Sequence, residues 1–320
     1  AKKIFKAIKK MSAPVLLHVY TKKGRGSDLA EKDAIKYYSL GGIKNSKNLK
    51  SIPDYSNVFG KSITQLAQKN DKIVCVTAAM EIGTGITPFI KKFPERYVDV
   101  GIAEEHAITY SAGLAAAGYK VVVPIYSTFM QRSYDHIFHD ALLQDLPIVY
   151  CMDRSGLVGP DGPTHHGVFD IAFMRSLPNM IVAAPKDGNE LKNLLATGLT
   201  SNRNFSIRYP KDTSICYDEN LFEDILNIGS WEKLIEGEKV AILAVGSMVA
   251  MVMENFCQIK NQVGYKPTVV NCRFIKPFDK ELLDELVENH NTIITIEEGI
   301  LIGGFGSAIS EHLHENNYKN

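Results

Sequence analysis

The alternation of short apolar runs with amphipathic segments constrains the fold of this 320-residue chain more than any other feature. β-Branched runs of four to seven residues are typical of buried strands, whereas apolar residues at a spacing of three to four indicate helices. Strands are expected over 73–77, 97–100, 120–124, 148–152 and 180–184, and helices over 56–68, 104–117 and 131–144. Strands that alternate with helices predict βαβ units and a parallel sheet.

A second unit of the same class is expected from about Gly229 onward. Strands are predicted over 239–245, 268–272 and 292–296, and helices over 249–260, 280–289 and the segment that follows the GGFG turn. Before the first unit, the run 15–20 (VLLHVY) also predicts a strand, and 27–53 is expected to be a linker. The fold class is therefore α/β, with two parallel-sheet domains.

Composition sets limits on the partners and the compartment. Hydrophobic residues make up 45% and charged residues 22%, as in ordinary soluble globular proteins, and the formal net charge of zero predicts neither a nucleic-acid nor a membrane-surface partner. No apolar run approaches the roughly 20 residues that span a bilayer. The five cysteines are odd in number and lack CxxC spacing. Buried free thiols of a reducing compartment, the cytoplasm or a plastid stroma, are therefore expected.

A polar loop follows the predicted strand 148–152. This loop, 153–167, holds Asp153, Arg154, Asp161, His165 and His166. Open α/β sheets bind their ligands beyond the carboxyl ends of the strands. The loop is therefore the first candidate for a functional site.

Three sequence motifs carry a resemblance to a known family. The segments are DRSGLVGPDGPTHHG at 153–167, YSTFMQR at 126–132 and AEEHAIT at 103–109. Together they resemble the 1-deoxy-D-xylulose-5-phosphate synthases, thiamine-diphosphate enzymes related to transketolase. The resemblance implies a remnant of the N-terminal diphosphate-binding domain at 1–50, a pyrimidine-binding domain at 51–212 and a C-terminal domain at 213–320 that we expect to be incomplete.

The activity implied by the resemblance is the condensation of pyruvate with D-glyceraldehyde 3-phosphate, with loss of CO2. Thiamine diphosphate and Mg²⁺ are the implied cofactors, and a homodimer is the implied assembly. The GDG segment and asparagine that hold magnesium and diphosphate in such enzymes have no counterpart in these residues. We therefore assign no metal ligand here and expect those ligands in an N-terminal domain.

The resemblance also assigns residues to the cofactor. Glu104 matches the glutamate that hydrogen-bonds the pyrimidine N1′ and thereby promotes loss of the thiazolium C2 proton. Phe129 matches the aromatic residue that stacks on the pyrimidine, and Met80 lies in the segment that approaches the cofactor from the other side. Glu105 is a rival carboxylate and His106 a secondary candidate.

The acceptor aldehyde carries a phosphate, which guanidinium groups bind well. Asp161 and His165 are the implied catalytic residues for acceptor hydroxyls and proton transfer, since histidine changes charge near neutral pH. The implied substrate-binding residues are Tyr126, Arg132, Arg154 and Arg208.

Two positions depart from the family pattern, and two other functions stay open. Ser27 stands where relatives usually carry an aromatic residue, and Tyr38 where they carry histidine. The chain could instead be the pyrimidine-domain subunit of a split transketolase or 2-oxoacid dehydrogenase. It could also be a non-catalytic fragment that folds and dimerises.

Overall fold

The computed structural model describes residues 1–32, 34, 37, 52–220 and 224–318. The chain divides into two compact units, Ala1–Ser51 and Ile52–Asn320.

The described part of the first unit has two short helices, α1 (Lys2–Ile8) and α2 (Asp28–Lys32), and neither buries a residue. The strand predicted over 15–20 is wrong, because this run is irregular and Leu16 is 95% exposed. A strand needs a neighbour to satisfy its backbone hydrogen bonds, and none pairs with this run among the described residues. Ser27 lies just before α2, where its hydroxyl accepts a long hydrogen bond from the Ala30 amide. Tyr38 lies outside the described residues.

The second unit is built on a seven-stranded sheet with the order β10-β5-β6-β4-β3-β1-β2. Its strands are β1 (Ile73–Thr77), β2 (Tyr97–Asp99), β3 (Lys120–Tyr126), β4 (Ile148–Asp153), β5 (Ile181–Ala183), β6 (Phe205–Arg208) and β10 (Phe274–Lys276). All neighbours are parallel except β10, which pairs antiparallel with β5. Every residue of β4 is buried, as expected for a central strand covered on both faces.

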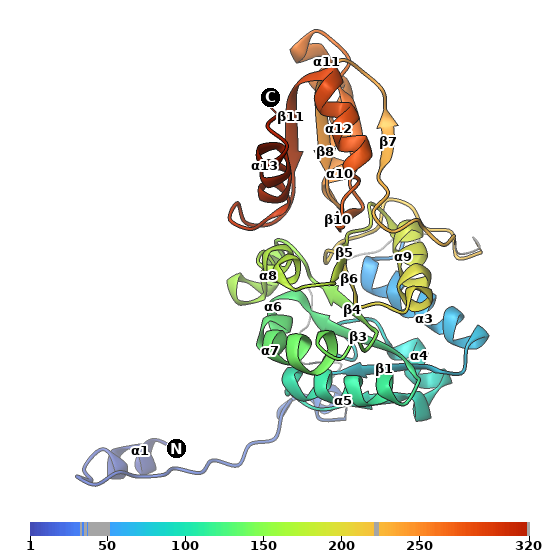
Figure 1. The fold of residues 1–320 in the computed structure, drawn as a ribbon. Coiled ribbons are helices and arrows are strands. Elements are labelled where there is room, and N and C mark those ends of the chain that lie inside the picture. Colours follow the sequence, from blue (N-terminus) through green and yellow to red (C-terminus); the bar gives the residue numbers. More distant parts are fainter. Residues whose placement is uncertain (33, 35–36, 38–51, 221–223, 319–320) are drawn as a thin grey trace. The chain divides into compact units, whose positions relative to one another are not determined.

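Helices cover both faces of this sheet (Figure 1). On one face α3 and α9 pack over Val149 and Cys151 of β4, and on the other α5 and α8 pack over Tyr150 and Met152. The helical segments are α3 (Tyr55–Lys69), α4 (Thr87–Lys92), η1 (Pro94–Arg96), α5 (Glu104–Ala116), α6 (Ser127–Met130), η2 (Gln131–Ser133), α7 (Tyr134–His136), η3 (Ile137–Leu142), η4 (Gly159–Asp161), η5 (Pro163–His165), α8 (Asp170–Ser176) and α9 (Gly188–Ser201). The single helix predicted over 131–144 is instead divided into 3₁₀, α and π turns.

A four-stranded sheet follows, with the order β11-β8-β9-β7. Its elements are β7 (Glu232–Ile235), β8 (Lys239–Ala244), α10 (Met248–Glu254), α11 (Phe256–Val263), β9 (Thr268–Asn271), α12 (Lys280–Asn289), β11 (His290–Ile296) and α13 (Phe305–Glu315). The helix predicted over 249–260 is broken at Asn255, whose ψ of 3° leaves the α-helical region.

The predicted fold class of two α/β domains is confirmed, although both sheets are mixed rather than wholly parallel. Three strands were not predicted from the sequence: β6, β7, which pairs antiparallel with β9, and β10. The strand β10 comes from the later part of the chain but extends the first sheet, so the two sheets are joined through it. Trp231 reinforces this junction, because its indole NH donates a 2.7 Å hydrogen bond to the Phe274 carbonyl.

Candidate functional site

The candidate residues gather at one edge of the seven-stranded sheet, where parallel strands end together. Tyr126 is the last residue of β3, Arg154 directly follows β4, Arg208 ends β6, and Met80 lies three residues after β1. The loop 153–167 leaves the same edge, so the ligand position expected for an α/β sheet is the one occupied by these side chains.

Three rings form a surface that we call the aromatic wall: Tyr126, Phe129 and His165. The ring centroids of Tyr126 and Phe129 lie 6.0 Å apart and are stacked, and His165 meets Phe129 edge-on at 5.3 Å. The Met80 sulfur accepts a 3.2 Å hydrogen bond from the Tyr126 amide, which fixes the turn after β1 against the wall. The structure thus brings together four residues from three separate segments.

Glu104 begins α5, where the helix dipole favours a negative charge. Its side chain is 1% exposed, whereas Glu105 is half-buried and His106 is exposed. The Glu104 Oε1 accepts a 2.5 Å hydrogen bond from Arg132 Nη1, and the same guanidinium lies 4.7 Å from the Phe129 ring centroid. Arg132 therefore connects the buried carboxylate to the aromatic wall.

Arg154 is held in place from four directions. Its Nη1 donates to Asp153 Oδ1 at 2.9 Å and to the Gly83 carbonyl at 2.6 Å, and its Nε donates to Asp161 Oδ2 at 3.1 Å. The guanidinium carbon lies 3.8 Å from the Tyr126 ring centroid, which is cation–π contact. With a φ of +63°, the backbone of Arg154 adopts the uncommon left-handed conformation.

Arg208 is turned inward, in contrast to Arg132. Its Nε donates a 2.9 Å hydrogen bond to the fully buried Asp170, and its Nη2 donates to the Glu298 carbonyl at 2.9 Å. Ser127 also donates to Asp170, at 3.0 Å. Because Arg208 is 4% exposed, the structure places it in a buried ion pair behind the wall rather than at the surface of the site.

The carboxyl groups of the site have opposite pKa shifts. Burial raises the pKa of Asp153 to about 6, even though Arg154 and the Ser56 hydroxyl favour its ionised form. Partial burial also acts to raise the pKa of Asp161, but hydrogen bonds and charges from Lys211 and Arg154 outweigh it and lower that pKa. Burial raises the pKa of Tyr126, so its hydroxyl stays protonated.

Sequence reasoning missed several residues of the site. Lys211 forms a salt bridge with Asp161, and Gly83 approaches so closely that a Cβ there would lie 1.5 Å from the Tyr126 hydroxyl. Lys211 lies three residues after the end of β6. Because ligands of α/β sheets bind beyond the carboxyl ends of strands, this position could have been identified from the sequence. Glu298, two residues after the end of β11, carried the same signal, whereas Asp170 gave none because its contact with Arg208 joins residues far apart in the sequence.

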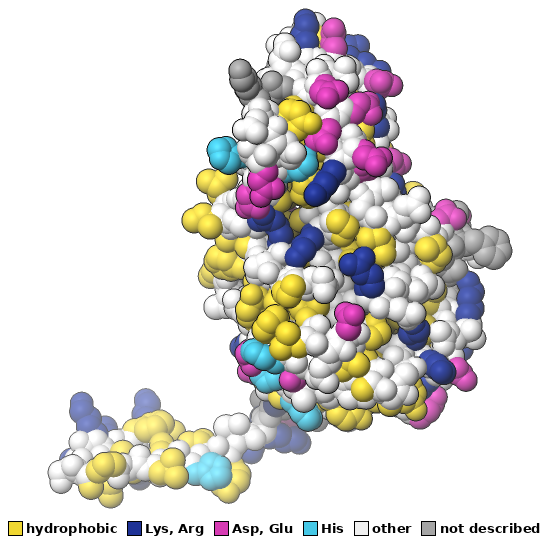
Figure 2. Space-filling view, in the orientation of Figure 1, with side chains coloured by type: hydrophobic (Ala, Val, Ile, Leu, Met, Phe, Trp, Pro, Cys, Tyr) yellow, Lys and Arg dark blue, Asp and Glu magenta, His cyan; other side chains and the backbone are white. Residues whose placement is uncertain are grey.

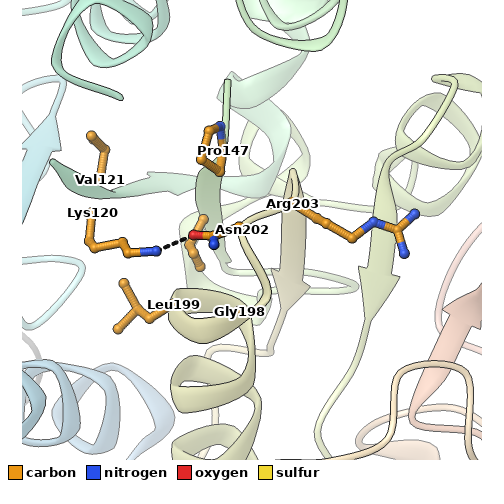
Figure 3. A pocket seen from close by; sticks show the side chains of 8 residues that line it. Lys120, Val121, Pro147, Gly198, Leu199, Asn202 and Arg203 are labelled. Carbon is orange, nitrogen blue, oxygen red and sulfur yellow. Dashed lines mark hydrogen bonds between the residues drawn. The ribbon is translucent and has the colours of Figure 1, made fainter. Parts of the chain in front are cut away.

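Two surface hollows among the described residues lie elsewhere. One is lined by Lys120, Val121 and Pro147, where Lys120 donates to Asn202 (Figure 3). Another is lined by Asp71, Lys72, Ala117, Gly118 and Tyr119. Both adjoin the residues that begin β1, β3 or β4 and so lie at the edge of the sheet opposite the aromatic wall.

Three further observations concern metals, membranes and thiols. Within the described ranges, no group of three or more His, Cys, Asp or Glu side chains could hold a metal ion. No helix among the same residues is long and apolar enough to cross a bilayer. All five cysteines are free: Cys75, Cys151 and Cys272 are buried as expected, whereas Cys216 and Cys257 are exposed.

Comparison with known families defines the class of protein. The family described as transketolase, pyrimidine binding domain matches residues 52–214, and that described as transketolase, C-terminal domain matches residues 229–320. The chain belongs to the transketolase family, with a pyrimidine-binding domain followed by a C-terminal domain.

Relatives within this family are more specific. The chain is 46% identical over 308 residues to the 1-deoxy-D-xylulose-5-phosphate synthase of Aquifex aeolicus, covering 95% of this chain and 49% of that protein. It is 48% identical over 309 residues to the synthase of Dictyoglomus thermophilum, covering 96% of this chain and 50% of that protein. The chain thus spans about half the length of the curated relatives it matches.

Solved structures show the same architecture. A split-gene transketolase, described as an inactive beta4 tetramer, matches with a TM-score of 0.74 and 29% identity over 82% of this chain and 84% of that one. Transketolase from Campylobacter jejuni matches with a TM-score of 0.66 and 19% identity over 82% of this chain and 44% of that one, which shows the shared fold.

The raised pKa of Asp153 predicts how stability depends on pH. Between its ordinary pKa of 3.8 and about 6, the folded state binds a proton that the unfolded state releases, so this group lowers stability as pH rises through that window. Asp153→Asn removes the effect. When the pH is raised from 4 to 7, the free energy of unfolding of the unchanged protein should fall by roughly 1–3 kcal/mol more than that of the variant. Denaturant unfolding at the two pH values measures this difference. The exposed Asp71→Asn controls for the loss of one carboxylate. A constant difference between Asp153→Asn and the unchanged protein would contradict the prediction.

Proposed function

We propose that this chain supplies the pyrimidine-binding and C-terminal domains of a thiamine-diphosphate-dependent 1-deoxy-D-xylulose-5-phosphate synthase. The reaction condenses pyruvate with D-glyceraldehyde 3-phosphate and releases CO2. Proteins of that name are 45–49% identical to this chain over nearly its whole length, which supports the proposal. The observation that carries the proposal is the buried carboxylate of Glu104 beside the aromatic wall.

The residues at this edge fit the pyrimidine half of the cofactor. Glu104 presents a carboxylate, Phe129 an aromatic face, and Met80 an apolar contact from the turn after β1. An aminopyrimidine has both a flat face for stacking and a ring nitrogen that can pair with a carboxylate. When bound, thiamine diphosphate supplies the electron sink for the loss of CO2. We expect its diphosphate and Mg²⁺ to be held by residues other than those of this chain.

Glu104 would hold the proton at the pyrimidine nitrogen. Its Oε1 is occupied by Arg132, which leaves Oε2 to receive a hydrogen bond from the ring. Burial excludes water from this contact, and the beginning of α5 stabilises the negative charge that the contact needs. Phe129, held between Arg132 and His165, would orient the ring against the carboxylate.

The acceptor would bind along the loop 153–167. His165 lies on the wall and could transfer a proton to or from the acceptor oxygen, while Asp161 would accept hydrogen bonds from its hydroxyl groups. Arg154 and Lys211 both pair with Asp161, and the partly exposed Arg132 lies over Phe129 of the wall, so these cations would attract the acceptor phosphate, with Tyr126 stacked against Arg154. Arg208 would either move away from Asp170 and bind the phosphate directly, or attract the phosphate from a distance through the electrostatic field of the buried Arg208–Asp170 ion pair.

Glu104→Gln tests the role of the buried carboxylate. In the protein that carries this chain, turnover of pyruvate and D-glyceraldehyde 3-phosphate should fall about 100-fold or more, because an amide cannot stabilise the protonated ring nitrogen. Glu105→Gln is the matched control, since it makes the same change one residue away at a half-buried position. Near-normal turnover by folded Glu104→Gln, or an equal loss in both variants, would rule the role out.

Arg154→Lys tests the acceptor site. The change keeps the positive charge but removes the planar guanidinium, whose Nε and Nη1 hold Asp161, Asp153 and the Gly83 carbonyl and whose Nη2 would bind the phosphate, so KM for D-glyceraldehyde 3-phosphate should rise about 10-fold while KM for pyruvate changes little. Steady-state kinetics with each substrate varied in turn measures the split. Arg203→Lys, an exposed arginine beside the hollow at the opposite edge, is the control (Figure 3). Equal increases in both KM values would contradict a specific role in acceptor binding.

A second candidate is the pyrimidine-domain subunit of a split transketolase. It is favoured by the match to the split-gene transketolase, of which this chain covers 84%. The two candidates differ in the donor substrate, because a transketolase takes its two carbons from a ketose phosphate and releases no CO2. Measuring CO2 release from pyruvate beside transfer from a ketose phosphate, with the assembled protein, separates them.

We further propose that two copies associate through the face beside the site. Several large apolar side chains are exposed there, and Figure 2 shows hydrophobic side chains gathered beside α8 and the loop before α13. The exposed fractions are 53% for Phe169, just before α8, and 85% for Leu301 and 83% for Ile302 in the connection before α13. Exposed apolar patches of several hundred square ångströms usually mark an interaction surface.

Sedimentation equilibrium of the protein tests this assembly. A dimer is expected, and Ile302→Asp should weaken it at least 10-fold because the change would bury a charge in an apolar contact. The exposed Val263, at the end of α11, provides the control Val263→Asp. A monomer at high concentration, or equal weakening by both variants, would contradict the proposed interface.

A further inference from the structure

Glu298 lies in the connection between β11 and α13, yet it contacts the candidate site. Its Oε1 accepts a 2.9 Å hydrogen bond from the Leu157 amide, at the beginning of the loop 153–167. Its backbone carbonyl accepts from Arg208 Nη2 at 2.9 Å. One residue of the connection after β11 therefore contacts both the loop and the buried arginine.

The backbone of the loop is shaped to admit this carboxylate. Gly156 has a φ of +77°, and a Cβ at this position would lie 2.3 Å from the Glu298 carboxyl carbon. A side chain on residue 156 would therefore exclude Glu298 as well as strain the backbone. The close approach is a feature that glycine alone permits here.

The hydrogen bond between Leu157 and Glu298 lies at the neck of the loop, where Gly156 and Gly167 pair. Gly156 and Gly167 exchange two backbone hydrogen bonds of 2.8 Å, which close the ten residues between them into a lobe. Asp161 and His165 both lie in this lobe, and the Leu157 amide is the first group inside it. Fixing that amide fixes the direction in which the lobe leaves the sheet.

Further hydrogen bonds involve Glu298 and its neighbour Glu297. The adjacent Glu297 accepts 2.8 Å hydrogen bonds from the Phe305 and Gly306 amides at the beginning of α13. Ser247, which follows β8, donates to Glu298 Oε2 at 3.4 Å. Residues that follow the carboxyl ends of β8 and β11 thus meet at the loop 153–167.

We propose that Glu298 is a positioning residue, whose carboxylate holds the lobe 156–167 so that Asp161 and His165 face the acceptor. The effect of Glu298 on acceptor binding rests on the proposed function, whereas its effect on the order of the lobe does not. Glu298 touches neither the aromatic wall nor Glu104, so it acts through the lobe and not on the cofactor side of the site.

Glu298→Ala and Glu298→Gln, made in the protein that carries this chain, test the proposal. Alanine removes the acceptor of the Leu157 amide, so amides of the lobe should exchange with deuterium about 10-fold faster and KM for D-glyceraldehyde 3-phosphate should rise about 10-fold. KM for pyruvate should change less than about two-fold, because the cofactor side is untouched. Glutamine should restore most of both properties, since its amide oxygen can accept the same hydrogen bond.

The control pair is Glu315→Ala and Glu315→Gln, at an exposed position near the end of α13. Unchanged exchange in the lobe of Glu298→Ala would overturn the inference, as would equal increases in both KM values or a failure of glutamine to restore them. If the unchanged protein formed no product from pyruvate and D-glyceraldehyde 3-phosphate, the proposed function would fail. The exchange measurement would still decide the role of Glu298.

Discussion

The parallel pairing of β1, β3, β4 and β6 is the constraint on which the rest of the structure depends. Parallel strands must run in one direction, and each must return through a helix, so their carboxyl ends meet at one edge. Tyr126, Arg154 and Arg208 are neighbours for this reason, although more than eighty residues separate the first from the last. The hollows at the other edge lie beyond the reach of these groups.

Burying charge beneath a polar site is the main energetic difficulty of this arrangement. Asp153, Arg154, Asp170 and Arg208 are all less than 9% exposed. Removing such groups from water costs several kcal/mol for each ion, and only close pairing with further hydrogen bonds offsets that cost. Each acid here meets an arginine and a serine hydroxyl. The result is a rigid base under the aromatic wall, in which the loss of one partner would leave the other charge buried and unpaired.

The smaller sheet contributes to the larger one in two ways. It adds the antiparallel edge strand β10, and it sends Glu298 to the neck of the loop 153–167. The core residues of the two sheets are continuous, with Trp231 and Phe305 in the same apolar cluster as Tyr150. A domain that contributes none of the wall residues therefore contacts the loop 153–167 and Arg208.

The sequence by itself determined the α/β class, most strands of both sheets and the edge where the site lies, because hydrophobic period and turn residues act over a few neighbours. Its motifs also assigned Glu104 rather than Glu105 to the cofactor; that assignment stays a prediction, and of the two residues only Glu104 is buried. Tertiary structure alone decided that β10 joins the first sheet, that Arg208 turns toward Asp170, and that Glu298 meets Gly156. Each of these contacts joins residues about 40 to 140 positions apart. They depend on how whole elements pack and where buried charges find partners, which no local pattern encodes.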